Sequence, residues 1–297
     1  MKKVIAILTL VVIVISCGVA PVTGRKQFFL VSDSEVMTLS LQSYTEYMAT
    51  AKKSSDMEKT KLVYKVGLNL AEAVEKYYQQ HPNVSKPTFA WEFNLVEDAQ
   101  VNAFCMPGGK IVVYTGILPL TQDETGLAVV LGHEVGHAMA KHSNERMSQQ
   151  VMIEGGGQIL GSILNTYTSQ QVSTLSQQIY GLGAQYGVTL PFSRKQELEA
   201  DEIGLTLMAM AAYDPSKATA FWQRMAAQGT KQMEFLSTHP SDAHRVENIS
   251  AHLAAAQIIY NTGSKKPNNP SFTIPSTGNT GSGTGSSSGS SGRPVIK

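Results

Sequence analysis

Cysteine and excess charge are what this 297-residue sequence has least of. Its two cysteines are Cys17 and Cys105, too few for a disulfide framework. The formal net charge is +1 and no basic stripe occurs, which argues against a nucleic-acid-binding surface. Hydrophobic residues make up 42% of the chain, so it can bury one sizeable core.

The sequence also lacks a long hydrophobic run at its start. After MKK, the apolar stretch 4–15 is too short to span a bilayer and is typical of a secretory signal. Val14-Ile15-Ser16-Cys17 resembles a bacterial lipobox, which implies cleavage before Cys17 and lipid on that cysteine. A plain secretory signal with an incidental cysteine is the alternative. Position 18 is glycine and not aspartate, the residue that typically retains such lipoproteins in the inner membrane. We therefore expect a lipid-anchored protein on the periplasmic side of a bacterial outer membrane.

Composition divides the chain into four segments. The last of them is rich in glycine, serine and threonine and cannot bury apolar surface, so we expect it to be disordered. The expected segments are a lipoprotein signal peptide (1–16), a lipidated N-terminal linker (17–33), one folded domain (34–260) and the Gly/Ser-rich tail (261–297). Within the domain, the Gly-rich stretch 154–165 suits a mobile loop that covers a cleft or touches a membrane.

The pattern of the folded part predicts an α+β domain that is mostly helical. "MPGGK" is a turn signal between two short extended stretches, which indicates a hairpin within a small antiparallel sheet. The expected strands cover 88–95, 101–105 and 110–115. Apolar residues at helical spacing and turn signals predict helices over 34–50, 56–80, 123–142, 145–153, 170–186, 193–212, 215–228 and 241–259.

The apolar helix 123–142 contains His133-Glu134-Val135-Gly136-His137. Histidines at positions i and i+4 share one helix face and can bind one zinc ion. Glu134, next to the first histidine, can accept a proton from a water molecule at the site. Two histidines and a glutamate in an apolar helix also need partners if they are buried. Core histidines with ordinary hydrogen-bond partners are the alternative.

A third protein ligand is expected outside this helix, because catalytic zinc sites usually have three. The stretch "RKQELEADEIG" (194–204) holds four acidic residues. On a helical wheel, Glu197 and Asp201 fall within or beside the apolar arc, whereas Glu199 and Glu202 lie on the far side. The first pair is therefore expected to face inward toward a cation, and the second pair to face solvent. Spacing alone does not choose between Glu197 and Asp201 as the ligand.

Together these motifs resemble the HtpX-like zinc metallopeptidases, the family that includes the CAAX prenyl proteases. The resemblance runs from about residue 21 to residue 253 and is strongest to the soluble periplasmic branch, the BepA- and LoiP-like lipoproteins. It implies a zincin-like metallopeptidase fold with Glu197 as third ligand and Asp201 steadying a zinc-bound histidine. The other motifs that carry it are "STHPSDAHR" (237–245), "PVTGRKQFFLVSDSEVM" (21–37) and "VNAFCMPGGKIVVYTGIL" (101–118).

The same resemblance adds two residues to the site. His239 matches a position that can approach the zinc, as a removable fourth ligand or as a stabiliser of the tetrahedral intermediate. A structural histidine before Pro240 is the alternative. Arg245 has a role in the site or its gate, or forms an ion pair with Asp201 or Glu247. His142 cannot reach the same zinc as His137, since it lies about 140° further round the helix, and is expected to make structural hydrogen bonds.

The hairpin suggests how substrate binds. Zinc peptidases often hold an extended substrate against a sheet edge, for which Asn102, Ala103 and Phe104 are the candidates, although an ordinary strand and turn would have the same pattern.

We therefore predict a zinc-dependent endopeptidase with one zinc ion bound by His133, His137 and Glu197. By resemblance, its substrates are misfolded or misassembled envelope proteins, and the outer-membrane assembly machinery is a possible partner. A chaperone or assembly factor with latent protease activity is the alternative, and a purely structural lipoprotein without metal is a third. Replacing Glu197 with Gln should abolish zinc binding, whereas replacing Glu199 with Gln should change almost nothing; measured zinc content tests both.

Overall fold

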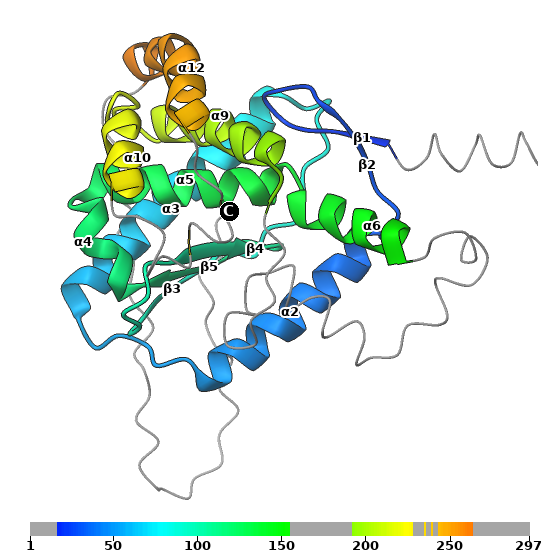
Figure 1. The fold of residues 1–297 in the computed structure, drawn as a ribbon, viewed down its shortest axis with the longest axis horizontal. Coiled ribbons are helices and arrows are strands. Elements are labelled where there is room, and N and C mark those ends of the chain that lie inside the picture. The colour runs from blue at the N-terminus through cyan, green and yellow to red at the C-terminus, as the bar shows by residue number, and fades with distance from the viewer. Residues whose placement is uncertain (1–16, 155–191, 228–234, 236–238, 240–242, 264–297) are drawn as a thin grey trace, which may run out of the picture.

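The computed structural model describes residues 17–154, 192–227, 235, 239 and 243–263 (Figure 1). Several of the predicted segments fall outside this range. They are the signal peptide 1–16, nearly all of the Gly-rich loop 154–165, the helix 170–186, and the tail beyond residue 263.

The described chain is mostly helical with a small sheet, which confirms the predicted fold class. Most helix ends lie within about three residues of the predicted ones, and the last helix continues to Thr262. The helices are α2 (Asp33–Thr50), α3 (Met57–Gln80), α4 (Leu118–Thr121), α5 (Glu124–Met139), α6 (His142–Glu154), α9 (Arg194–Met210), α10 (Lys217–Ala227) and α12 (Ala243–Thr262), with a short 3-10 turn, η1 (Thr115–Ile117).

Side-chain caps explain where the helices that carry the acidic and histidine motifs begin. The Asp123 side chain accepts a hydrogen bond from the Gly126 amide and starts α5. Ser193 and Gln196 form a capping box at the start of α9. Because this box sets the first turn of α9, it also sets the direction in which Glu197, the next residue, leaves the helix.

The sheet has the order β3-β5-β4, with β3 at Glu92–Val96, β4 at Ala103–Met106 and β5 at Lys110–Tyr114. The β4–β5 hairpin is antiparallel, as predicted, with Cys105 opposite Ile111. However, β3 pairs parallel with β5, so the expectation of a purely antiparallel sheet is wrong. The second strand of the hairpin, β5, is the central strand of the sheet and is buried along its whole length. This pairing order is tertiary information that strand patterns do not carry.

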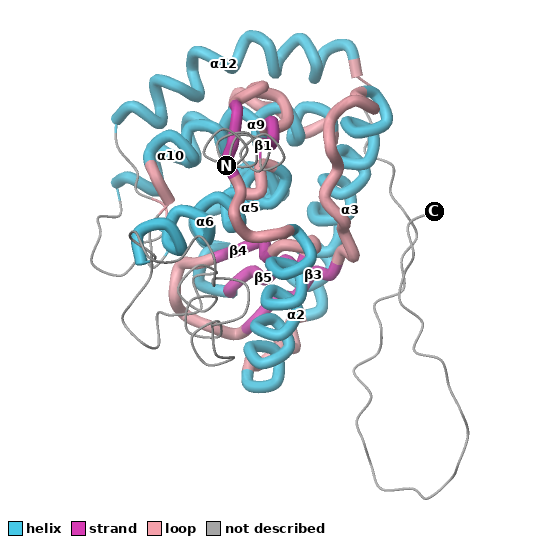
Figure 2. Tube along the Cα trace, turned by 90° about the vertical axis from the view of Figure 1, so that its right-hand side faces the viewer, coloured by secondary structure: helices cyan, strands magenta, loops and turns pink. Residues whose placement is uncertain are grey.

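The two faces of the sheet pack against different helices. One face joins the main core with α3 and α5, and its residues are Phe93, Leu95, Ala103, Cys105, Ile111 and Val113. The other face forms a second cluster with α2, and its residues are Val96, Phe104, Met106, Val112 and Tyr114. Figures 1 and 2 both place α2 and α12 on opposite sides of the layer that contains α5 and the sheet.

Helices α5 and α9 cross at unusually close range because glycines form the contact. A Cβ atom added at Gly136 would lie 2.7 Å from the carbonyl oxygen of Ala200. One added at Gly204 would lie 2.9 Å from the amide nitrogen of His133. The absence of side chains at these points lets the HExxH helix and the acidic helix approach backbone to backbone.

Residues 17–33, expected to be a linker, are instead docked on the domain. Strand β1 (Cys17–Val19) pairs antiparallel with β2 (Lys26–Phe28). Ala20 is buried in the main core, and the Gln27 side chain donates a hydrogen bond to the carbonyl of Ala140. The turn between the strands reverses through Val22 and Gly24, both with positive φ. We call residues 17–28 the N-terminal hairpin. Acylation of Cys17 stays a prediction.

We expect Gly136→Ala to separate α5 from α9, since its new methyl group would overlap the Ala200 carbonyl. Overpacking of this kind costs about 1–3 kcal/mol, offset in part by the roughly 1 kcal/mol that alanine adds to helix propensity. Zinc binding should weaken as well, because the two helices supply different ligands. Urea unfolding and zinc content measure both effects.

Gly263→Ala is the matched control, because its new methyl group meets only carbonyls of its own helix. An unchanged unfolding midpoint together with full zinc content in Gly136→Ala would contradict this view of the crossing.

Candidate metal centre

The first two candidate ligands come from one face of α5. His133 and His137 lie one turn apart, and their Nε2 atoms are 3.1 Å apart. His133 is only 1% exposed, and almost every residue of α5 is buried. The histidines therefore face the protein interior, and neither is available to bulk water.

Helix α9 brings two carboxylates to the same place. Glu197 is fully buried, and its Oε2 and Oε1 atoms lie 3.4 Å from the Nε2 atoms of His133 and His137, respectively. Asp201, one turn further, lies behind His133, with its Oδ1 atom 2.8 Å from Nδ1. Glu197 thus faces the same ring nitrogens that converge between the helices, whereas Asp201 holds the opposite edge of one ring.

A fourth candidate ligand, His239, joins this group. Its Nδ1 atom is 3.0 Å from Glu197 Oε1 and 3.3 Å from His133 Nε2. The ring stacks on Phe235 and on Phe192, with centroid distances of 4.5 and 5.1 Å. The backbone amide of Phe235 in turn donates to the carbonyl of Val101, next to β4.

The donor set fits a zinc ion. Among the described residues, one ligand atom from each of His133, His137, Glu197 and His239 lies within 4.8 Å of all the others. Nitrogen or oxygen atoms about 2.0–2.1 Å from a tetrahedral zinc are roughly 3.3–3.4 Å apart. The pairs described above span 3.0–3.4 Å. Glu197 Oε2 accepts no hydrogen bond, and its cationic neighbour among the described residues is the Arg245 guanidinium, 3.1 Å away, so the carboxylate is held ionised as a metal ligand must be.

The electrostatics of the ligands also suit a metal. Burial would raise the pKa of Glu197, but the charges of His239 and Arg245 outweigh it and hold the pKa well below its usual range. Burial lowers the pKa of His137, which keeps that ring neutral. Burial and Arg245 also lower the pKa of His133, yet Asp201 and Glu197 outweigh them and raise it to about 9. Metal binding must therefore displace a proton from His133.

Glu134 lies beside the ligand cluster without belonging to it. Its side chain is buried, and its Oε1 atom has no hydrogen-bond partner and lies 3.5 Å from His239 Nε2. Burial, with the nearby charge of Glu197, raises its pKa above the usual value, although His239 and His133 lower it in part. The backbone amide of Cys105, on β4, also hydrogen-bonds to this carboxylate. A carboxylate in such surroundings is a stronger base than one in water.

Arg245 balances the buried acids. Its guanidinium is only 1% exposed and donates two hydrogen bonds to Asp201, at 2.7 and 2.8 Å. A third nitrogen, Nη1, lies 3.1 Å from Glu197 Oε2, and the group stacks on Trp222 at 3.8 Å from the ring centroid. Burial would raise the pKa of Asp201, but Arg245 and His133 lower it below its usual value. The expected ion pair with Asp201 is present, and the same arginine also reaches the ligand cluster.

The expectation that Glu199 faces solvent is wrong. Glu199 is 5% exposed and accepts hydrogen bonds from Arg25 and His142. These partners, with Thr23, outweigh burial and lower its pKa to about 2. Glu202, by contrast, is half-buried, with His252 Nε2 3.4 Å away. A wheel of α9 alone cannot identify Glu199, because its partners come from the N-terminal hairpin and from α6.

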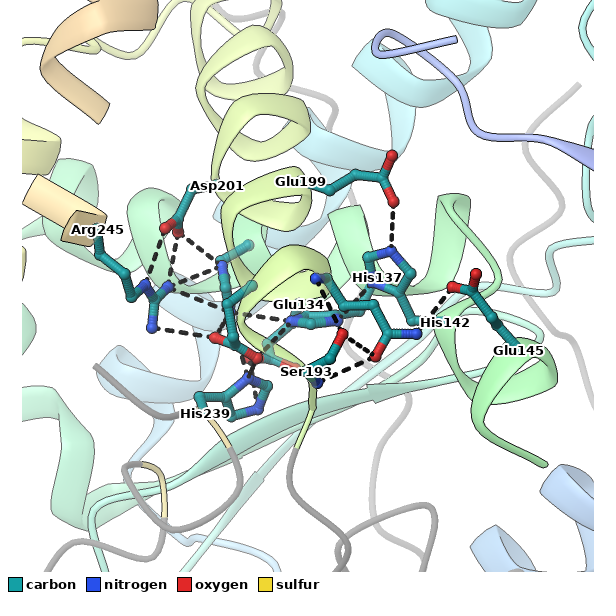
Figure 3. A network of polar contacts seen from close by, with 12 residues as sticks. Glu134, His137, His142, Glu145, Ser193, Glu199, Asp201, His239 and Arg245 are labelled. Carbon is teal, nitrogen blue, oxygen red and sulfur yellow. Dashed lines mark hydrogen bonds and ion pairs between the residues drawn. The ribbon is translucent and has the colours of Figure 1, made fainter. Parts of the chain in front are cut away.

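Figure 3 shows these polar groups arranged on two sides of Glu134. Asp201 and Arg245 lie on one side, whereas Glu199, His142 and Glu145 lie on the other. Both groups of buried charges therefore adjoin the histidines of α5.

The predicted substrate-binding residues lie along the edge of the sheet. Ala103 and Phe104 belong to β4, which pairs only with β5 in the described sheet, and Asn102 directly precedes it. The carbonyl of Asn102 accepts the amide of Tyr114, so the alternation of an antiparallel ladder directs the backbone groups of Ala103 away from β5.

Comparisons with known proteins agree with this geometry. Residues 65–253 match the model of peptidase family M48. The chain is 41% identical to the mitochondrial metalloendopeptidase OMA1 of Schizosaccharomyces pombe over 57% of this chain and 48% of that protein. It is 32% identical to OMA1 of Saccharomyces cerevisiae over 81% of this chain and 70% of that protein. It is 32% identical to the beta-barrel assembly-enhancing protease of Yersinia pestis over 60% of this chain and 39% of that protein.

These findings correct part of the sequence-based prediction. The metallopeptidase family is confirmed, but the bacterial lipoprotein branch is not supported. The predicted bacterial outer-membrane location is wrong. The S. pombe relative, at 41% identity, and the S. cerevisiae and human relatives, which align over 81% of this chain, are all named mitochondrial. The chain spans about half the length of several relatives, for example 48% of the S. pombe protein and 47% of the human one.

Among the helices in the part of the chain that the structure describes, none is long and apolar enough to span a bilayer.

Proposed function

We propose that this chain, which belongs to peptidase family M48, is a zinc-dependent endopeptidase acting on extended polypeptides. One observation carries the proposal. The ligand atoms of His133, His137 and Glu197 converge at tetrahedral spacing directly beside the buried carboxylate of Glu134. This is the combination that zinc-assisted peptide hydrolysis uses.

In the proposed mechanism, His133, His137 and Glu197 hold the zinc ion. When bound, zinc supplies a Lewis acid that polarises the scissile carbonyl and makes water more acidic. Glu134 accepts a proton from the attacking water as the water oxygen bonds to the carbonyl carbon. It then gives that proton to the amide nitrogen as the C–N bond breaks. Asp201 and Arg245 act on the ligands: Asp201 orients His133, and Arg245 orients Asp201 and neutralises part of the buried charge.

We propose that the substrate chain pairs with the outer edge of β4 at Ala103, which is fully buried in this structure and must be uncovered for substrate to bind. The backbone groups of Ala103 support this, since they point away from β5, while the side chains of Asn102 and Phe104 are almost fully buried and would shape the edge from within. An extended backbone is recognised in this way without regard to most side chains. Unfolded segments are therefore the expected substrates.

The narrower prediction of misassembled membrane proteins as substrates rests on names alone. Two relatives, at 32% and 28% identity, are called beta-barrel assembly-enhancing proteases. Those names also support the alternative function, an assembly factor with secondary protease activity, and a partner in membrane-protein assembly.

We expect Glu134→Gln to bind zinc normally but to digest casein at least about 100-fold more slowly, because it removes the proton acceptor without removing a ligand. A chelator should abolish the activity of the wild-type protein, and added zinc should restore it. Casein digestion and zinc content are the measurements.

Glu202→Gln is the matched control, because it makes the same change on the half-buried face of α9. If Glu134→Gln digests casein at the wild-type rate, the proposed mechanism fails. If Glu134→Gln fully replaces the wild-type protein in a deletion strain, the assembly-factor function is the main one.

We propose that His239 is a removable fourth ligand that holds the site latent. Its Nδ1 atom lies within 3.3 Å of ligand atoms of His133 and Glu197, which supports coordination. His239→Ala should therefore raise casein digestion, on the order of tenfold. The control is His252→Ala, a half-buried histidine of α12 that lies beside Glu202 and is not part of the ligand cluster. Unchanged or reduced activity of His239→Ala would contradict latency, and reduced activity would favour a role in stabilising the tetrahedral intermediate.

A further inference from the structure

A continuous series of polar contacts leads from His137 to the N-terminal hairpin. His137 Nδ1 lies 2.8 Å from His142 Nδ1, and His142 Nε2 lies 2.8 Å from Glu199 Oε2. The Nε of Arg25 lies 2.8 Å from the same carboxylate oxygen. All of these side chains except that of Arg25 are almost fully buried. Each ring nitrogen of His142 thus has one close partner: Nδ1 faces His137 and Nε2 faces Glu199 (Figure 3).

The contacts allow one arrangement of protons when His137 binds a metal. A histidine that coordinates through Nε2 carries its proton on Nδ1 and donates it. His142 Nδ1 must then accept, so the His142 proton is on Nε2. That N–H points at Glu199, which can only accept. Each hydrogen bond in the series thereby determines the next, and the carboxylate at the end determines the tautomer of both rings.

The carboxylate is in turn held by the N-terminal hairpin. Thr23 donates its hydroxyl hydrogen to Glu199 Oε1, and Arg25 binds Oε2. Arg25 extends further and forms a bidentate pair with Glu145, at 2.6 and 2.8 Å. One arginine therefore joins α9 to α6, the helix that begins with His142. Without Arg25, these two nearly buried carboxylates would lose the positive charge that they share, and Glu199 would keep only its contacts with Thr23 and His142.

The other metal-binding histidine has the same kind of support. His133 donates from Nδ1 to Asp201, and Arg245 holds Asp201 with two hydrogen bonds. Both α5 histidines are thus backed by a carboxylate and an arginine. The difference is that an additional imidazole, His142, stands between His137 and its carboxylate. A carboxylate behind a metal-binding histidine raises the basicity of the ring and fixes its orientation.

We propose that His142, Glu199 and Arg25 form a positioning relay for the metal ligand His137, so that the N-terminal hairpin is part of the metal centre. The relay rests on the proposed zinc site and names residues that are not ligands. Its members do not touch the zinc or the substrate. They act through His137, by fixing its tautomer and the plane of its ring.

The test compares zinc affinity in the full chain carrying Glu199→Gln or Glu145→Gln, by competition with a chromophoric chelator. Each substitution removes one of the two carboxylates that pair with Arg25. Of these two, Glu199 is the one that contacts the His142 ring. We expect Glu199→Gln to raise the zinc dissociation constant about 10- to 100-fold, the usual effect of losing such a support. This replaces the sequence-based expectation that the substitution changes almost nothing, which assumed an exposed side chain. Glu145→Gln should lower thermal stability while changing zinc affinity little.

A second measurement reports on His137 directly. The visible absorption bands of the cobalt-substituted protein depend on the orientation of the ligands and should shift in Glu199→Gln and His142→Leu but not in Glu145→Gln. His142→Gln keeps an acceptor for the His137 N–H and should recover part of the zinc affinity that His142→Leu loses. Should Glu199→Gln fail to fold, these two variants of His142 carry the same comparison.

The relay is overturned if Glu199→Gln binds zinc as tightly as the wild-type protein. It is also overturned if Glu145→Gln weakens zinc binding equally, because the ion pairs then only hold the fold together. Failure of the metal centre itself is distinguishable, since the wild-type protein would then bind no stoichiometric zinc in the first titration.

Discussion

Helix α9 buries three carboxylates, those of Glu197, Glu199 and Asp201, and the structure around them is arranged to supply positive charge. An isolated ionised carboxylate in the protein interior costs several kcal/mol, so each needs a close partner. Arg245 is shared between Glu197 and Asp201, and Arg25 binds Glu199. The proposed metal ligands His133 and His137 of α5 face the carboxylate of Glu197. The acidic helix can pack against α5 only with these partners in place.

This requirement joins parts of the chain that are far apart in sequence. Arg25 comes from the N-terminal hairpin and Arg245 from α12, and they reach α9 from different sides. Buried ion pairs contribute little net stability compared with apolar packing, but their hydrogen-bond geometry is specific. In this protein that geometry restrains the histidines. The glycines of the α5–α9 crossing contribute in another way, because they bring the two backbones close enough for side chains of both helices to share one centre.

Helical periodicity was sufficient to predict much of the site. The i, i+4 spacing puts His133 and His137 on one face in any α-helix, and the wheel directs Glu197 and Asp201 inward. The helix limits lie near the predicted ones because they are set locally, by caps such as Ser193 that act within a few residues. The parallel pairing of β3 with β5 and the docking of residues 17–33 depend on contacts between distant segments. A local pattern contains no information on them. The predicted location failed for a related reason, since it extended a four-residue lipobox resemblance to the whole protein.

The misplacement of Glu199 shows what a helical wheel measures. A wheel separates apolar from polar positions, and it equates polar with exposed on the assumption that only one side of the helix is covered. Helix α9 packs against α5, α12 and α3, and the N-terminal hairpin approaches it as well. Its polar face is therefore also interior, and a charged residue there is stabilised by partners that the wheel does not contain. Its partners, Arg25 and His142, become candidates only once the N-terminal hairpin is known to dock on α9, because a buried imidazole and an arginine in a docked segment both require an acceptor.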